Sequence, residues 1–491
     1  MAAVVVSVAL LFSARAAHGK TLKGHLPGPV TSLQALGALP ASTNLQLAIG
    51  LPLRNAQALN DLLRELSDPT STNFLHYLSS EEFTERFGPT AEDYEKVATF
   101  ARASGLVVTA THPNRLILDV TGSVADIEKA FKLKLRIYKH PTEPRNFHAP
   151  DVEPSVPDDL PILDISGLDD YMPPRPMDLK RRTNAPPYSR DGPISFPLGG
   201  GTRTNDEQQV SFATGSGPGG DFLGYDFRAA YAPGVTLTGV GQVIGLFEFG
   251  PYFTNDIILY KQAAGLPDVT VTNVLLDGYT GIPPAGADDG EEALDIDMAM
   301  CMAPGATIVV YEGNSAIDIM NRIATDNKAK QIGCSFGFYP PPGTMDNVFL
   351  QYAAQGQTFF VASGDNGAYS TNLIFAPADD PNITSVGGTS LTTTGPRGNW
   401  VSETTWIGSG GGITPHYGIP TYQAGMNMST NHGSTSQRNF PDVAMLADTV
   451  IFWYLKNGQS GTVGGTSAAA PLWAGFMALV NQQAAANGRA S

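Results

Sequence analysis

The stretch QVIGLFEF at residues 242–249 decides the fold of the larger part of this chain, because it is a short and almost wholly apolar run. Runs of the same kind occur at TIVVYE (307–312) and TFFVAS (358–363), and helical patterns lie between them. Strands that are apolar on both faces are typical of parallel sheets covered by helices. We therefore predict an α/β fold from about residue 222, built on a doubly wound, mostly parallel sheet.

The first half of the chain follows a different pattern, in which short strands alternate with amphipathic helices. The predicted elements are a strand at 45–51, a helix capped by Asn55, a helix from Thr90 to Gly105, strands at about 106–111 and 115–121, a helix from Ser123 and a last strand at about 133–138. This order, β-α-α-β-β-α-β, predicts a small α+β domain that is ferredoxin-like in outline.

Residues 172–221 separate the two halves and are rich in proline, glycine and charge, without any periodicity. Such a segment is typical of a linker and is an accessible target for proteases. Within it, Lys180-Arg181-Arg182 is either a processing site or a solvated cluster of charge.

The N-terminus resembles a secretory signal peptide, with an apolar run over residues 2–12 and small residues at Ala14, Ala16 and Ala17. No later run is long and apolar enough to span a membrane. The net charge of −16 argues against a nucleic-acid partner and suits an acidic medium. The two cysteines, Cys301 and Cys334, either pair in an oxidising compartment or remain buried thiols.

The sequence Gly-Gly-Thr-Ser occurs twice and offers two candidate nucleophiles, Ser390 and Ser467. A nucleophilic serine often lies at a glycine-flanked turn that leads into a helix, where backbone N–H groups face the developing oxyanion. Ser467 is followed by a helical apolar pattern, whereas Ser390 is followed by the β-branched stretch LTTTG. We therefore expect Ser467 to be the nucleophile and Ser390 to end a strand.

A serine nucleophile needs a base, and the α/β half contains only two histidines, His416 and His432. Carboxylates are the alternative, because the helical segment GADDGEEALDIDMAMCMAPG (286–305) places Glu291 and Asp295 on one face at i and i+4. Two close carboxyl groups can share a proton, which moves their pKa values apart. Glu292 and Asp297 offer competing pairs, and spacing alone does not choose among them.

Three separated motifs, GEEALDID, SGDNG (363–367) and GGTSAAAP, resemble in this order the signature segments of the sedolisins, or serine-carboxyl peptidases, particularly kumamolisin-like members. The segments at 54–90, 114–131 and 156–170 resemble the pro-kumamolisin activation domain, and DFRAAYAPG (226–234) resembles the start of the mature enzyme. The resemblance covers roughly residues 44–485. It implies a subtilisin-like fold and a Ser-Glu-Asp triad.

The resemblance also implies a role for each matching residue. Ser467 would be the nucleophile, Glu291 the general base and then acid, and Asp295 the residue that orients Glu291. Asp365 would be an acid of the oxyanion hole, and its carboxyl group must be protonated to donate a hydrogen bond.

The chain departs from the family pattern in three places. Phe336 replaces the family's usual tryptophan, and Glu248 matches a carboxylate that in some members lies behind the catalytic glutamate. The family's aspartate-rich calcium loop would lie beyond Ser491, so we expect no calcium site and no other cofactor in this chain.

These observations predict a secreted, acid-acting serine endopeptidase made as a zymogen, with its own prodomain as inhibitor and proteins or peptides as substrates. Two alternatives remain open, a non-catalytic relic with a folded prodomain and a His432-dependent subtilisin-like protease. The expected boundaries are a signal peptide at 1–19, an activation prodomain at 20–171, a linker at 172–221 and a peptidase domain at 222–491.

Overall fold

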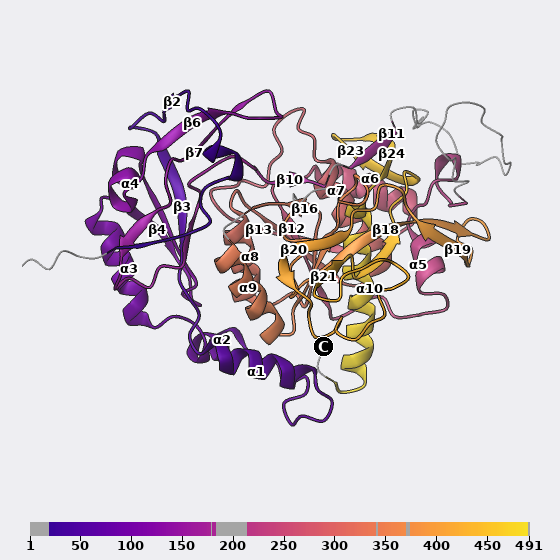
Figure 1. Cartoon of the computed structure of the whole chain (residues 1–491). Helices are drawn as coiled ribbons and strands as arrows, with labels where there is room; N and C mark the ends of the chain where they lie inside the picture. The colour runs from indigo at the N-terminus through magenta and orange to yellow at the C-terminus, as the bar shows by residue number, and fades with distance from the viewer. Residues whose placement is uncertain (1–18, 178, 183–213, 340–341, 370–373, 490–491) are drawn as a thin grey trace, which may run out of the picture. The chain divides into compact units, whose positions relative to one another are not determined.

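The computed structural model describes residues 19–177, 179–182, 214–339, 342–369 and 374–489. The predicted signal peptide and most of the predicted linker therefore lie outside the described residues. The chain forms two compact units, which are described separately (Figure 1). The first comprises Met1–Leu51, Thr90–Ala110 and Leu118–Tyr171, and the second comprises Pro52–Pro89, Thr111–Ile117 and Met172–Ser491.

The first unit is built on a four-stranded sheet in the order β4-β5-β3-β9. Its strands and helices are β3 (Asn44–Gly50), α3 (Ala91–Ala103), β4 (Val107–Thr111), β5 (Ile117–Ser123), α4 (Val124–Phe131) and β9 (Asp164–Ser166). Both helices begin as predicted, because the Thr90 and Ser123 hydroxyls accept hydrogen bonds from the N–H groups of Asp93 and Asp126. Val97 and Ile127 from these helices pack with Ile49 in one buried core.

The last predicted strand of this domain forms but lies in a different sheet. It is β6 (Leu135–Lys139), which pairs with β2 (Gly37–Ala38) and β7 (Asn146–Pro150). The edge of the main sheet is instead β9, which is antiparallel to β3. The last strand of the main sheet is therefore β9, which lies further along the chain than the predicted strand. Two other short strands, β1 (Gly19–Thr21) and β8 (Ser155–Pro157), pair with each other.

The second unit contains the predicted parallel sheet, in the order β13-β14-β12-β15-β17-β18-β19, with β22 also paired to β18. All of its pairings are parallel except that of β18 with β19. The strands are β12 (Val243–Glu248), β13 (Thr270–Leu275), β14 (Thr307–Glu312), β15 (Gln331–Cys334), β17 (Thr358–Ala362), β18 (Thr384–Thr393), β19 (Trp400–Thr405) and β22 (Val443–Leu446).

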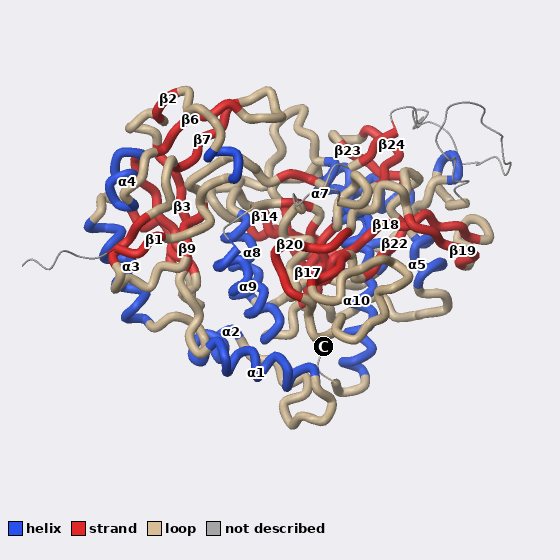
Figure 2. Tube along the Cα trace, viewed as in Figure 1, coloured by secondary structure: helices blue, strands red, loops and turns tan. Residues whose placement is uncertain are grey.

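Helices cover both faces of this sheet, as a doubly wound fold requires (Figure 2). On one face α7 (Gly290–Met302) packs against α10 (Thr466–Ala486), and on the other α8 (Ala316–Asp326) packs against α9 (Pro342–Ala354). The unit also includes α1 (Ala56–Ser67), α2 (Ser80–Arg86), α5 (Tyr225–Tyr231) and α6 (Thr254–Ala264).

Two local expectations differ from the structure. Asn55 precedes α1 as predicted, but it adopts φ 53° and makes no capping hydrogen bond, since its side-chain amide donates to the Arg86 carbonyl instead. The start of the predicted linker is ordered by two short strands, β10 (Arg175–Pro176) and β11 (Lys180–Arg182). Backbone pairing to other strands can order a segment that has no periodicity of its own.

Both cysteines are buried free thiols, so the disulfide alternative is wrong. Cys301 contacts the Tyr260 hydroxyl, and Cys334 contacts the Phe336 carbonyl. Among the described residues, no helix has the length and apolarity needed to cross a membrane.

Candidate active site

The candidate site lies where the parallel strands of the second unit end. Glu248 is the last residue of β12, Ser335 follows β15 directly, and Asp365 follows β17. Because β12, β15 and β17 are parallel neighbours, their carboxyl ends share one edge of the sheet. The sheet therefore brings together residues that are far apart in the sequence.

The acidic residues of α7 are buried, although acidic residues near a helix N-terminus are usually exposed. Asp295 accepts a hydrogen bond from the Ser335 hydroxyl at 2.7 Å, which directs it toward the carboxyl edge of the sheet. The charges that act on Asp297 are those of Asp256 and Asp289. The structure thus separates Asp297 from Asp295, whereas the charge of Glu292 still acts on Glu291.

Ser467 occupies the first turn of α10 and is completely buried. The residue before it, Thr466, donates from its backbone N–H and its hydroxyl to one oxygen of Asp365, at 2.7 and 2.8 Å. The Ser335 hydroxyl lies 3.1 Å from the backbone carbonyl of Ser467. Ser335 therefore connects Ser467 to Asp295, and Thr466 connects the same turn of helix to Asp365.

Burial controls the proton affinity of these carboxyl groups. It raises the pKa of Glu291 well above its usual range, and the charge of Asp295 adds to the effect. The Ser467 hydroxyl favours the ionised form of Glu291, although the two side chains do not lie in hydrogen-bonding geometry. Burial raises the pKa of Asp295 to about 8, although Ser335 and Glu248 favour its ionised form. The pKa of Glu248 is also raised well above its usual range, by burial and by the charge of Asp295. Burial therefore favours the protonated forms of these three acids.

Neither histidine of the α/β half joins this cluster. His416 lies 2.8 Å from a carboxylate oxygen of Asp379, and His432 is exposed on a loop at φ 57°. In the part of the chain that the structure describes, no hydrogen bond links either ring to Ser467. The other candidate serine, Ser390, lies within β18 and donates to Asp448. These positions favour carboxylates over a histidine as the base.

Sequence analysis did not assign roles to Ser335 and Thr466, and it left the role of Glu248 uncertain. Thr466 immediately precedes the predicted nucleophile, and Glu248 ends a predicted buried strand. Their positions in the sequence could therefore have indicated that they lie near the site. The position of Ser335 gave no such indication, because its function depends on a contact with Asp295, 40 residues away in sequence.

A segment from the predicted linker runs along this site. Its first strand, β10, pairs antiparallel with β16 (Phe336–Gly337), directly after Ser335. Its second strand, β11, pairs antiparallel with β24 (Gln459–Gly464), which leads toward Ser467. We call the described residues 175–177 and 179–182 the cleft segment.

The cations of the cleft segment are held by side chains of the second unit. Lys180 donates to the Asn366 side chain at 2.9 Å, and Asn366 is the neighbour of Asp365. Arg181 lies 2.6 Å from Asp288, and its guanidinium group stacks over the Trp453 ring. Lys180 and Arg181 are therefore bound to side chains rather than simply solvated.

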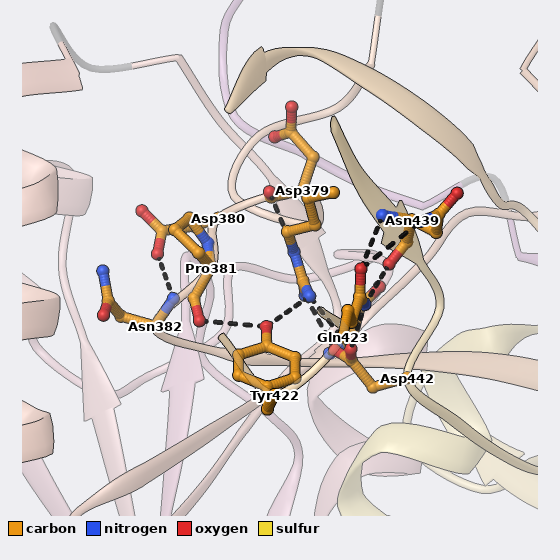
Figure 3. Close-up of polar contacts among 10 residues, drawn as sticks. Asp379, Asp380, Pro381, Asn382, Tyr422, Gln423, Asn439 and Asp442 are labelled. Carbon is orange, nitrogen blue, oxygen red and sulfur yellow. Dashed lines mark hydrogen bonds and ion pairs between the residues drawn. The ribbon is translucent and has the colours of Figure 1, made fainter. Parts of the chain in front are cut away.

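A separate hollow of about 940 Å³ lies at the opposite edge of the sheet, since it is lined by the first residues of β17, β18 and β22. Beside it, the buried Arg438 donates two hydrogen bonds to Asp442 and one to the Tyr422 hydroxyl (Figure 3). Gln423 bridges to the backbone of Asn439 on the same wall. Because these charged and amide groups satisfy one another, we interpret this network as structural support.

Comparison with known proteins gives two family matches. The family described as "Pro-kumamolisin, activation domain" matches residues 31–171, and the "Subtilase family" matches residues 285–490. The second match includes the α7 acids, Asp365 and Ser467.

Two relatives and one solved structure illustrate the similarity. Kumamolisin from Bacillus sp. (strain MN-32) is 29% identical, over 83% of this chain and 75% of that protein. Xanthomonalisin from Xanthomonas sp. (strain T-22) is 26% identical, over 92% of this chain and 59% of that protein. A structure of Pseudomonas sedolisin, described as a serine-carboxyl proteinase, is 26% identical with a TM-score of 0.47, over 54% of this chain and 82% of that one.

Proposed function

Because this chain belongs to the sedolisin family of serine-carboxyl peptidases, with a pro-kumamolisin activation domain ahead of a subtilase-family domain, we propose that it is a secreted serine endopeptidase that acts in acid and is made as a zymogen. One observation carries the proposal. The first turn of α10 presents Ser467 between two buried acids, with Ser335 linking it to Asp295 and Thr466 linking it to Asp365.

The proposed reaction begins when the Ser467 hydroxyl attacks a substrate carbonyl and Glu291 accepts its proton. Asp295 orients Glu291, and the backbone N–H of Ser467 together with protonated Asp365 donates to the oxyanion. Glu291 then gives the proton to the leaving amine, and an acyl-enzyme remains on Ser467. Water hydrolyses the ester by the same steps in reverse order, and the enzyme is restored.

Acid suits this arrangement better than neutral pH. Asp365 can donate a hydrogen bond only in its protonated form, and a histidine base would itself be protonated in acid. Burial raises the pKa of Glu291, so its carboxylate form is a stronger base toward the Ser467 hydroxyl than an exposed glutamate would be.

We propose that the cleft segment blocks the precursor against other peptide substrates until the segment itself has been cleaved. Its pairing with β16 and β24 occupies the backbone groups that would otherwise bind an extended peptide, and Ser467 has no exposed surface. Release of this segment would open the site. The expectation that the chain needs no metal or other cofactor stays a prediction, and the steps above use only its own residues.

The test is to incubate the purified precursor across about pH 3 to 7 while following its size and its cleavage of a denatured protein. We expect conversion to a smaller, active species only at acid pH, and no conversion in Ser467→Ala. His432→Ala is the control, because its side chain lies outside the proposed site.

Two other results would each contradict the proposal. Activity that rises toward neutral pH and disappears in His432→Ala would establish the histidine-dependent alternative. A precursor that unfolds cooperatively, yet neither shortens nor cleaves protein at any pH, would be the non-catalytic relic.

A further inference from the structure

We propose that this peptidase cleaves its own chain on the carboxyl side of Met177, and that the pocket for the side chain of this residue selects an apolar side chain about the size of methionine. The inference rests on the proposed function and deepens it, because it names the bond and the type of residue that the same site recognises.

The cleft segment enters the site in the manner of an extended substrate. Arg175 and Pro176 pair antiparallel with Gly337 and Phe336, and the Met177 N–H donates to the Ser335 carbonyl at 3.1 Å. Peptides bound as an added strand gain affinity from such main-chain bonds and specificity from pockets for their side chains. Since the Ser335 hydroxyl contacts Asp295 and the carbonyl of Ser467, Met177 is held directly beside the catalytic residues.

The segment leaves the site along the opposite wall. A Cβ atom at Gly465 would lie 2.9 Å from Cδ1 of Leu179, so the Leu179 side chain packs against the turn that precedes Ser467. Lys180 then pairs with Gly464, and Arg182 pairs with Thr462. Met177 and Leu179 therefore contact the two sides of the site, at Ser335 and at Gly465, and the basic run follows Leu179.

Burial points to Met177 as the residue on the acyl side. Its side chain is 1% exposed, and a Cβ atom at Gly337 would lie 3.3 Å from its terminal methyl group. The same Cβ atom would lie 3.0 Å from Phe375, whose ring also carries the Arg175 guanidinium at 4.7 Å. Gly337 and Phe375 thus bound a narrow apolar pocket, which the flexible, unbranched methionine side chain fills.

The cleavage follows the proposed mechanism. The Ser467 oxygen bonds to the Met177 carbonyl carbon, the bond from that carbon to the next amide nitrogen breaks, and this nitrogen takes the proton from Glu291. Water then hydrolyses the ester. Met177 gains a free carboxyl group, and residue 178 becomes the new N-terminus.

The first experiment maps the cleavage of the full precursor in acid by mass spectrometry and N-terminal sequencing, beginning with its earliest product. We expect a fragment that begins at Asp178. Met177→Leu should process within a few-fold of the natural chain, whereas Met177→Lys should slow cleavage by about 10²-fold or more, because it places a charge in an apolar pocket. Met172→Lys is the matched control, because Met172 precedes the paired strands.

A second experiment removes any effect of these substitutions on folding of the precursor. The processed enzyme is given the peptide PPRPMDLKRR, which spans residues 173–182, and the same peptide with lysine in place of methionine. We expect cleavage after methionine in the first peptide and at least about 10²-fold slower cleavage in the second.

Earliest cleavage at another bond by the active natural chain, or equal rates for Met177→Lys and the natural chain, would overturn this inference and leave the proposed function standing. A folded precursor that cleaves neither itself, nor the peptide, nor denatured protein would overturn both.

Discussion

At the scale of single residues, the contacts of Asp365 indicate how its carboxyl group could donate a hydrogen bond to an oxyanion. One of its oxygens already accepts two hydrogen bonds from Thr466, at 2.7 and 2.8 Å. The proton of the neutral acid would therefore sit on the other oxygen. Donation to an oxyanion then depends on keeping that proton, which links the proposed activity to low pH.

Substitutions of Asp365 test this role. Asp365→Ala removes the donor, so we expect kcat to fall by about 10²–10³-fold. Asp365→Asn keeps an oxygen for Thr466 and supplies an N–H donor that does not titrate, so it should retain more activity and lose less of it as the pH rises. The measurement is kcat against pH for both variants. Equal losses in the two variants would mean that Asp365 does not act as a donor.

At the scale of elements, α7 and the cleft segment have features that a local sequence pattern does not predict. All residues of α7 are buried, including the acids in its first turns, because α10 packs against it. The cleft segment has no periodicity, yet its two short strands are ordered by partners far along the chain. Helix caps are the opposite case, because they depend on residues only three apart.

The N-cap of α3 gives an element-scale prediction. The Thr90 hydroxyl accepts a hydrogen bond from the Asp93 N–H at 3.0 Å. Thr90→Ala should therefore lower the free energy of unfolding by about 1 kcal/mol, whereas Thr90→Ser should stay close to the natural chain. Denaturant unfolding of both variants measures the difference, and an unchanged midpoint in Thr90→Ala would contradict it.

At the scale of the whole molecule, the buried titratable groups of the two units respond to pH in opposite directions. The second unit buries carboxyl groups whose pKa is raised mainly by loss of hydration, to about 8 for Glu292 and about 7 for Glu312. The first unit buries His25, whose pKa is lowered by burial despite the opposing charge of Glu153. A carboxyl group whose pKa is higher in the folded state stabilises the fold at low pH. A histidine whose pKa is lower in the folded state stabilises the fold at high pH.

We therefore expect the second unit to lose stability as the pH rises. The unfolded pKa of a glutamate is about 4.3, so Glu292 contributes its full stabilisation below that pH and loses it as the pH passes through about 8. Denaturant midpoints of Ser467→Ala at about pH 4, 6 and 8 measure the slope without self-digestion.

Adding Glu292→Gln should flatten that slope, whereas Glu85→Gln, an exposed position on α2, should leave it unchanged. A midpoint that rises with pH would contradict the expected sign.

The first unit should behave in the opposite way. The His25 ring accepts a hydrogen bond from the Ile165 N–H at 2.9 Å through Nε2, which a protonated ring could not do. The stabilisation from neutral His25 is present above the unfolded pKa of about 6.5 and is lost as the pH falls through the lower folded value. Hydrogen exchange at the Ile165 amide should therefore show more opening at about pH 5 than at pH 7, after correction for intrinsic rates.

His25→Gln provides the control, because glutamine offers an acceptor that does not titrate. We expect the pH dependence of opening to be reduced in this variant. An equal dependence in both proteins would show that another group controls the opening.

The sequence by itself determined which segments form elements and of which kind. Apolar runs such as 243–248 and caps such as Thr90 depend on neighbouring residues, so periodicity and hydrogen bonding within one turn were sufficient. The order of three motifs behind an activation domain also named the four candidate catalytic residues, through resemblance to a family. It did not show how these residues meet.

Only the tertiary structure decided which groups touch. Asp295 meets Ser335 across 40 residues, and Asp365 meets Thr466 across 101. The same holds for β9, which displaces the predicted strand β6 from the main sheet, and for Met177 in the cleft. The physical reason is that parallel strands join residues distant in sequence at one edge, and burial there, rather than local spacing, sets which acids keep their protons.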